Sequence, residues 1–245
     1  MLKKRNKKLK IRINLFIVTF VILCFSFIFS NFIEDNKDIE GNENNLEEYK
    51  ETYSQNISSQ YLKLVNKSNS IDANYEPNDL VIPSIRFGNI GNMMVQYMRR
   101  DAAVELEQLF KAAKKEGLNL VAISGYRSYD YQETVYSNEV NSVGEIQANR
   151  YVAKPGQSEH QTGLAMDVLS DEYMSLDEGF ENTAAFKWLD KNMSKFGFIL
   201  RFPKGKERIT GYGYEAWHLR YVGIEAATEI MDNGITLEEY LSELS

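Results

Sequence analysis

Apolar and polar residues follow different periods along the chain, and these periods predict its helices and strands. Between residues 100 and 116, apolar side chains recur every three or four positions, which is the spacing of an amphipathic helix. Gly117 follows and is typical of a helix terminus. We expect further helices over residues 129–141, 183–196, 224–233 and 237–244.

Shorter apolar runs predict a small β-sheet. The run LNLVAIS at 118–124 has the length and composition of a strand, and a buried strand is expected over 164–169. Two more strands are predicted over 198–202 and 216–222. These elements do not alternate as regularly as in a doubly wound sheet. We therefore predict one α+β domain over 61–245, with a small, mostly antiparallel sheet covered by helices.

The first 33 residues have a different pattern. Residues 1–12 contain seven lysines and arginines and no acidic residue, and an apolar run over 13–33 follows. At roughly 20 residues this run is long enough to cross a bilayer, and a basic flank is typical of the cytoplasmic side. We therefore predict a basic cytoplasmic tail, a single transmembrane helix and an extracytoplasmic domain.

Two alternatives to an uncleaved signal-anchor stay open. A cleaved signal peptide is less favoured because no small-x-small cleavage site follows the run. A lipoprotein would use Cys24, but the large Leu23 precedes it. Residues 34–60 are acidic and rich in asparagine, so we expect a disordered tether that spans on the order of 30 Å.

Charge and cysteine content narrow the possible partners of the domain. Because seven of the 28 basic residues lie in the tail, the 35 acidic residues outnumber the basic ones by 14 in the rest of the chain. Such a surface does not bind nucleic acid by charge. The single cysteine lies in the apolar run, so the exported domain contains no disulfide bond.

The chain has only two histidines, and each lies in a sequence that suits a zinc site. His160 lies in SEHQTGLAMD at 158–167, and His218 ends EAWH at 215–218. A single histidine is more often a hydrogen-bonded core residue, but here two histidines occur with matching carboxylates. His160, Asp167 and His218 would supply three ligands of one catalytic Zn²⁺ and leave the fourth position open.

Other residues near these motifs have the chemistry of a hydrolase. Glu215 is expected in a turn before His218, where its carboxylate could take a proton from zinc-activated water and pass it to a leaving amine. Arg127 follows a predicted strand and could hold a substrate carboxylate or stabilise an oxyanion. Further candidates for the substrate pocket are Ser158, Gln132, Tyr126 and Trp217, the last of which fits the core equally well.

These motifs resemble the zinc D-alanyl-D-alanine carboxypeptidases of the VanY type. The resemblance covers about residues 62–223 and is carried by LVNKSN (64–69), SGYRSYDYQ (124–132), SEHQTGLAMD (158–167) and GFILRFPKGKERITGYGYEAWHLRYVG (197–223). It implies the fold of the hedgehog signalling domain and a zinc ion held by His160, Asp167 and His218. It also implies Glu215 as the catalytic base and Arg127 as the group that stabilises the reacting carbonyl.

The resemblance implies an enzyme that removes the C-terminal D-alanine from peptidoglycan stem pentapeptides. One alternative is an L,D-carboxypeptidase that acts on tetrapeptides with the same machinery. Another is a non-catalytic wall-binding module, because this fold also occurs in signalling proteins. Retention of Glu215 beside a complete ligand set argues against the module.

The predicted topology can be tested by fractionation. We expect the protein in the membrane fraction of intact cells, with the chain beyond about residue 34 outside. Protease added after removal of the cell wall should cut the tether and release a domain fragment. A mature protein in the medium whose N-terminus lies near residue 31 would show that the apolar run is a cleaved signal peptide.

Overall fold

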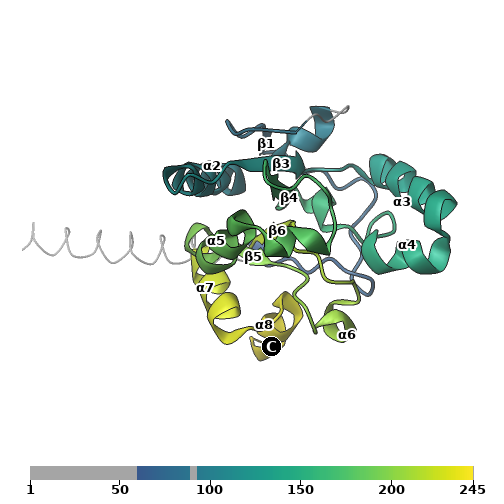
Figure 1. The fold of residues 1–245 in the computed structure, drawn as a ribbon. Coiled ribbons are helices and arrows are strands. Elements are labelled where there is room, and N and C mark those ends of the chain that lie inside the picture. The colour runs from purple at the N-terminus through teal and green to yellow at the C-terminus, as the bar shows by residue number, and fades with distance from the viewer. Residues whose placement is uncertain (1–59, 89–92, 245) are drawn as a thin grey trace, which may run out of the picture. The chain divides into compact units, whose positions relative to one another are not determined.

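The computed structural model describes residues 60–88 and 93–244, which form one compact unit with the sheet at its centre (Figure 1). In that part of the chain no helix is long and apolar enough to cross a membrane. The predicted basic tail, the predicted transmembrane segment and the tether up to residue 59 lie outside the described residues. Their prediction is therefore unchanged.

The central sheet has four antiparallel strands in the order β3-β4-β6-β5. Its members are β3 (Leu120–Ser124), β4 (Ala165–Ser170), β6 (His218–Tyr221) and β5 (Phe198–Leu200). A separate two-stranded sheet pairs β1 (Leu80–Val81) with β2 (Met98–Arg99). The predicted α+β class and antiparallel sheet are confirmed. The two strands expected over 198–202 and 216–222 are shorter than predicted.

The strand register brings residues from distant parts of the sequence to one place. Asp167 on β4 lies directly opposite His218 on β6 and is also the partner of Ser124 on β3. Residues opposite each other on neighbouring strands point to the same face of a sheet. An irregularity between Ala122 and Ser124 interrupts the β3–β4 ladder next to Asp167. Such bulges commonly redirect side chains beside active sites.

Helices pack around this sheet on several sides. Helix α2 (Arg100–Lys115) packs along β3 through an apolar face that includes Leu106 and Leu109, both fully buried. Helices α7 (Ile224–Asn233) and α8 (Leu237–Glu243) surround a second apolar cluster that includes Ile199 of β5. The remaining helices are α3 (Tyr129–Val143), α4 (Glu145–Tyr151), α5 (Ala184–Asn192) and α6 (Glu207–Thr210).

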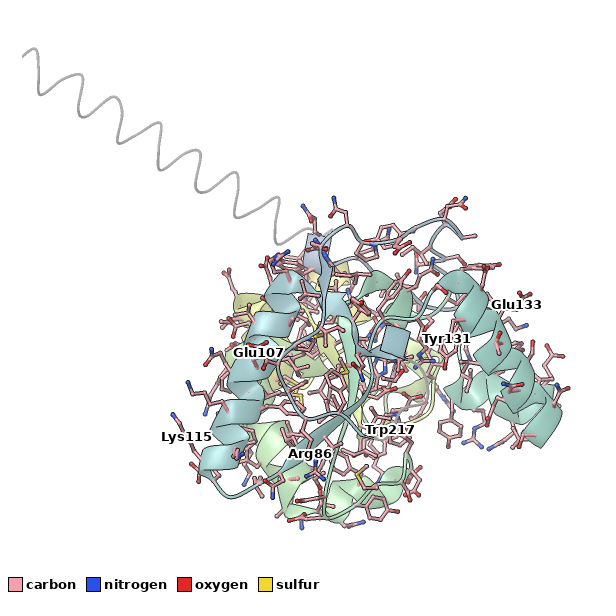
Figure 2. The ribbon with its side chains drawn as sticks, turned by 90° about the horizontal axis from the view of Figure 1, so that it is seen from above. Arg86, Glu107, Lys115, Tyr131, Glu133 and Trp217 are labelled. Atoms are coloured by element: carbon pink, nitrogen blue, oxygen red, sulfur yellow. The ribbon has the colours of Figure 1, made fainter. Side chains whose placement is uncertain are left out.

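Helices α3 and α4 lie apart from α2. In both views α3 and α4 lie on the opposite side of the domain from α2, and in Figure 2 Trp217 appears between α2 and α3. Helix α4 was not predicted, because its short segment carries little apolar periodicity. The helix expected over 183–196 is α5 followed by a 3₁₀ turn over Met193–Phe196.

Two glycines near the centre of the fold are required by close packing. Gly163 joins the 3₁₀ helix Glu159–Thr162 to β4 with φ +69°, a conformation that side chains other than glycine rarely adopt. A Cβ atom there would also lie 2.9 Å from Leu80 Cδ2. At Gly125, after β3, a Cβ atom would lie 2.8 Å from Met166 Cε. Gly163 thus lets the chain before β4 pack closely against Leu80 and Arg99, and Gly125 lets the chain after β3 pack against Tyr97 and Met166.

Candidate active site

Three buried side chains that could hold a metal converge at the centre of the sheet. His160 comes from the 3₁₀ helix before β4, Asp167 lies within β4, and His218 is the first residue of β6. One possible ligand atom from each lies within 4.8 Å of the others. The structure therefore brings together the three residues that the sequence motifs single out.

The hydrogen bonds of His160 determine which ring nitrogen faces the cluster. Its Nδ1 lies 2.7 Å from the carbonyl oxygen of Gly125. Because a carbonyl only accepts hydrogen bonds, Nδ1 must donate its proton, and Nε2 keeps a lone pair. Nε2 lies 3.5 Å from Asp167 Oδ2, so the lone pair belongs to the nitrogen nearest the other donors.

His218 presents its other nitrogen to the cluster. Its Nδ1 lies 3.0 Å from Asp167 Oδ1, and its ring meets that of His160 edge to face at a centroid distance of 4.9 Å. The Nε2 atom of His218 points to the opposite side, 3.5 Å from Glu159 Oε2. Two imidazole nitrogens and a carboxylate oxygen form the donor set of a catalytic zinc site, so these residues fit the metal.

The electrostatics of the cluster suit a cation. Burial and the nearby Arg127 lower the pKa of His160 to about 4, which keeps this ring neutral. Burial alone would raise the pKa of Asp167, but both histidines hold it well below its usual range. Burial alone would lower the pKa of His218, but Asp167 and Glu159 raise it to about 9. A metal at this site therefore has to displace a proton from His218.

Glu215 lies in the loop immediately before β6 and is buried beside the cluster. Its Oε2 is 3.8 Å from His218 Nδ1, and its backbone N–H donates to Phe202 O at 3.1 Å. Burial raises the pKa of Glu215 to about 8. A carboxylate with such a pKa can both accept and release a proton near neutral pH, as a general base must.

Arg127 lies in the loop between β3 and α3 and contacts the cluster from another side. Its Nη1 donates to Gln132 Oε1 at 3.0 Å, and its Nη2 lies 3.4 Å from Asp167 Oδ2. Gln132 in turn donates to Ala153 O at 2.8 Å, which fixes the guanidinium. Nε of Arg127 is buried and has no hydrogen-bond partner within the described residues. This guanidinium thus has an unused donor beside the candidate metal ligands.

A cavity of about 290 Å³ opens onto these groups. Of the predicted substrate contacts, Ser158, Gln132 and Trp217 line the cavity. The side-chain amide of Gln132 is already hydrogen-bonded to Arg127 and to the carbonyl oxygen of Ala153. Tyr126 does not line the cavity and is buried in the core. Arg127, the next residue in the chain, does line the cavity.

The sequence motifs did not single out several residues of this site. Tyr151, Phe202 and Tyr212 line the cavity from α4 and from the loops that flank α6. Glu159 was not among the predicted site residues, yet it is buried and in contact with His218 and two arginines. One signal could have revealed this ion cluster: Arg201 and Arg220 each lie within a segment predicted to be a strand, among mostly apolar residues.

Glu159 remains charged despite complete burial. Burial alone would raise its pKa, but the positive charges of Arg201 and Arg220 hold the pKa well below its usual range. Both arginines donate to the same oxygen, Oε1, at 2.6 Å. The carboxylate is therefore a fixed negative charge behind His218.

Comparison with known proteins finds one family over the region that carries this site. The family described as "VanY: D-alanyl-D-alanine carboxypeptidase" matches residues 95–224. The protein YodJ of Bacillus subtilis (strain 168) is 53% identical over 184 residues, which cover 75% of this chain and 67% of YodJ.

Two solved structures share the fold at substantial identity. The structure of the LdcB LD-carboxypeptidase has a TM-score of 0.69 and 53% identity, with 73% of this chain and 84% of that chain covered. A mutant of the vancomycin-resistance D,D-pentapeptidase VanY, in complex with Zn(II), has a TM-score of 0.60 and 36% identity. The match covers 74% of this chain and 99% of that one.

The candidate ligands can be tested by metal titration of the purified full chain. We expect one zinc ion per chain, and we expect His160→Ala, Asp167→Ala and His218→Ala each to lose it. Loss of a direct ligand should weaken binding by more than the roughly 10- to 100-fold typical for an outer-shell partner. Competition with a chromophoric chelator measures this, with Glu139→Ala, which changes another cavity residue, as the control. Full zinc occupancy in His218→Ala would show that the ligand set is wrong.

Proposed function

Because the chain belongs to the VanY family of D-alanyl-D-alanine carboxypeptidases, we propose that it uses one zinc ion to remove the C-terminal D-alanine from peptidoglycan stem peptides. The observation that carries this proposal is the convergence of His160, Asp167 and His218 beside Glu215 in one cavity. The predicted membrane segment supports a location at the outer face of the cell membrane, where stem peptides are found.

The metal ligands and Glu215 have separate roles in the proposed reaction. When bound to His160, Asp167 and His218, zinc supplies a Lewis acid that polarises the scissile carbonyl and makes water acidic enough to lose a proton near neutral pH. Glu215 accepts the proton of the attacking water as the new C–O bond forms. It then delivers this proton to the leaving nitrogen as the C–N bond breaks, which releases a free amino acid.

Arg127 supports cleavage at a chain end. Its fork of donors matches a carboxylate, and its buried Nε has no hydrogen-bond partner within the described residues. A guanidinium so close to the metal ligands can hold the terminal carboxylate or the oxygen on which negative charge develops. This position favours an exopeptidase over an enzyme that cuts within a peptide.

The two candidate substrates are pentapeptide stems, cut between two D-alanines, and tetrapeptide stems, cut after an L-centre. The sequence motifs, taken alone, favour the pentapeptide as the substrate. The 53% identity with an LD-carboxypeptidase, against 36% with a D,D-pentapeptidase, supports the tetrapeptide instead. We therefore propose L,D-carboxypeptidase activity as the main reaction, with D,D-carboxypeptidase activity as the alternative on the same machinery.

The role of Glu215 predicts a separation of metal binding from turnover. Glu215→Gln should keep the fold and the zinc ion but lose the proton acceptor, so kcat should fall by on the order of 10²- to 10⁴-fold. Stopped assays of D-alanine release, with zinc content measured on the same samples, test this. Glu139→Gln is a matched control, because it neutralises another carboxylate that lines the cavity. Near-normal turnover of Glu215→Gln would remove this residue from the mechanism.

The substrate proposal is tested with purified stem peptides and mass analysis of the products. We expect D-alanine release from tetrapeptides to exceed that from pentapeptides, and no cleavage within cross-links. Stems amidated at the C-terminus should resist, because amidation removes the carboxylate and leaves the guanidinium of Arg127 unpaired.

Each other outcome has a distinct meaning. Cleavage of pentapeptides alone would reverse the order of the two substrates and leave the catalytic machinery unchanged. If a folded, zinc-loaded chain cleaves neither stem, the enzyme proposal is wrong, and a wall-binding module takes its place.

A further inference from the structure

We propose that Glu159 is a positioning residue that orients His218 by accepting a hydrogen bond from its Nε2–H, so that Nδ1 faces the metal. This inference rests on the proposed function and concerns a residue outside the predicted ligand set. Glu159 Oε2 and His218 Nε2 lie 3.5 Å apart. Both atoms are buried and lack a hydrogen-bond partner elsewhere in the described residues.

The two ring nitrogens of His218 have different surroundings. Nδ1 lies on the side of Asp167 and the candidate metal ligands, and Nε2 lies on the side of Glu159. A neutral imidazole that binds a metal through Nδ1 carries its proton on Nε2. A buried N–H without an acceptor is unfavourable, and the carboxylate of Glu159 is the acceptor on that side. Histidine ligands of metals almost always donate their second N–H in this way.

Glu159 is held so that only one of its oxygens is available to His218. Its Oε1 accepts hydrogen bonds from Arg201 Nε and from Arg220 Nη1, both at 2.6 Å. Arg220 is fixed in turn, because its Nη2 donates to the carbonyl oxygens of Tyr61 and Lys63. Arg201 pairs with Glu238 through both terminal nitrogens. The two arginines therefore aim Oε2 at the imidazole.

The separation of 3.5 Å exceeds an ordinary N–H···O hydrogen bond. The proposal therefore includes a small movement: His218 approaches Glu159 when the metal fixes Nδ1. No other acceptor within the described residues competes for Nε2. Glu159 acts through His218 and does not touch the substrate.

The variant Glu159→Gln tests this role with nearly unchanged side-chain volume. Its amide oxygen can still accept from both arginines, but its NH₂ group then faces His218 Nε2. Two donors cannot share a hydrogen bond, so the imidazole is driven to the tautomer with its proton on Nδ1, which cannot bind the metal. The reverse amide orientation would place the NH₂ group against the arginine donors and is also unfavourable.

Glu238→Gln is the matched control. Glu238 lies at the partly buried edge of the same ion cluster and contacts Arg201, but no contact joins it to His218. Both variants remove one negative charge from the cluster. A purely structural role of the cluster would therefore affect both in the same way.

The experiment measures zinc affinity by chelator competition on the full chain, together with long-range ¹H–¹⁵N NMR of the imidazole rings. With only two histidines in the chain, the ring signals are readily assigned. We expect zinc binding by Glu159→Gln to weaken about 10- to 100-fold, as for other outer-shell partners. The Nε2–H signal of His218, present in the zinc-loaded wild type, should be lost or shifted. Glu238→Gln should retain wild-type affinity and the wild-type signal.

Three results would overturn the proposal. Unchanged affinity and an unchanged His218 signal in Glu159→Gln would show that the carboxylate does not orient the ring. Equal weakening in both variants would assign Glu159 a structural role only. If the wild-type chain binds no zinc, the proposed function fails, and the positioning role fails with it, whereas the first two results overturn the positioning role alone.

Discussion

The site depends on the register between β4 and β6. Asp167 and His218 lie 51 residues apart in the chain but directly opposite each other on these strands, and Asp167 also faces Ser124 of β3. Because side chains alternate between the two faces of a strand, a slip of one residue would turn one partner away from the other. The antiparallel ladder thus fixes two candidate metal ligands, and the loop after β3 then holds the third candidate, His160, through the carbonyl of Gly125.

Behind Asp167 and His218 the protein buries a second group of charged residues. Glu159, Arg201 and Arg220 are almost completely inaccessible to solvent. Their hydrogen bonds connect the 3₁₀ helix that contains His160 with strand β6 and with the end of β5. Such a cluster is an uncertain source of stability, because desolvation of the ions opposes their attraction. Its geometry has another consequence, since it places a fixed carboxylate behind one candidate metal ligand, His218. Hydrophobic residues could replace it in packing but could not orient an imidazole.

Sequence reasoning recovered much of the fold and most of the site. Helical spacing located α2, and short apolar runs located the four strands of the central sheet. The same reasoning placed α3, α5, α7 and α8 close to their actual positions. It missed α4, which is short and mostly polar, and it extended β5 and β6 beyond their actual ends. Tyr126 was grouped with Arg127 as a pocket residue, but the direction of each side chain follows from backbone conformation that motifs do not reveal.

The sequence by itself determined the chemistry: two histidines, their carboxylate companions and the motifs around them predict metal-assisted hydrolysis, because few other uses need those residue types together. Only the tertiary structure decided how they act. It assigned Nε2 of His160 and Nδ1 of His218 to the cluster, through contacts with Gly125 and Asp167. It also revealed that Glu159 faces His218. These outcomes depend on contacts between segments distant in the chain, and no local pattern of residues encodes which atoms will meet.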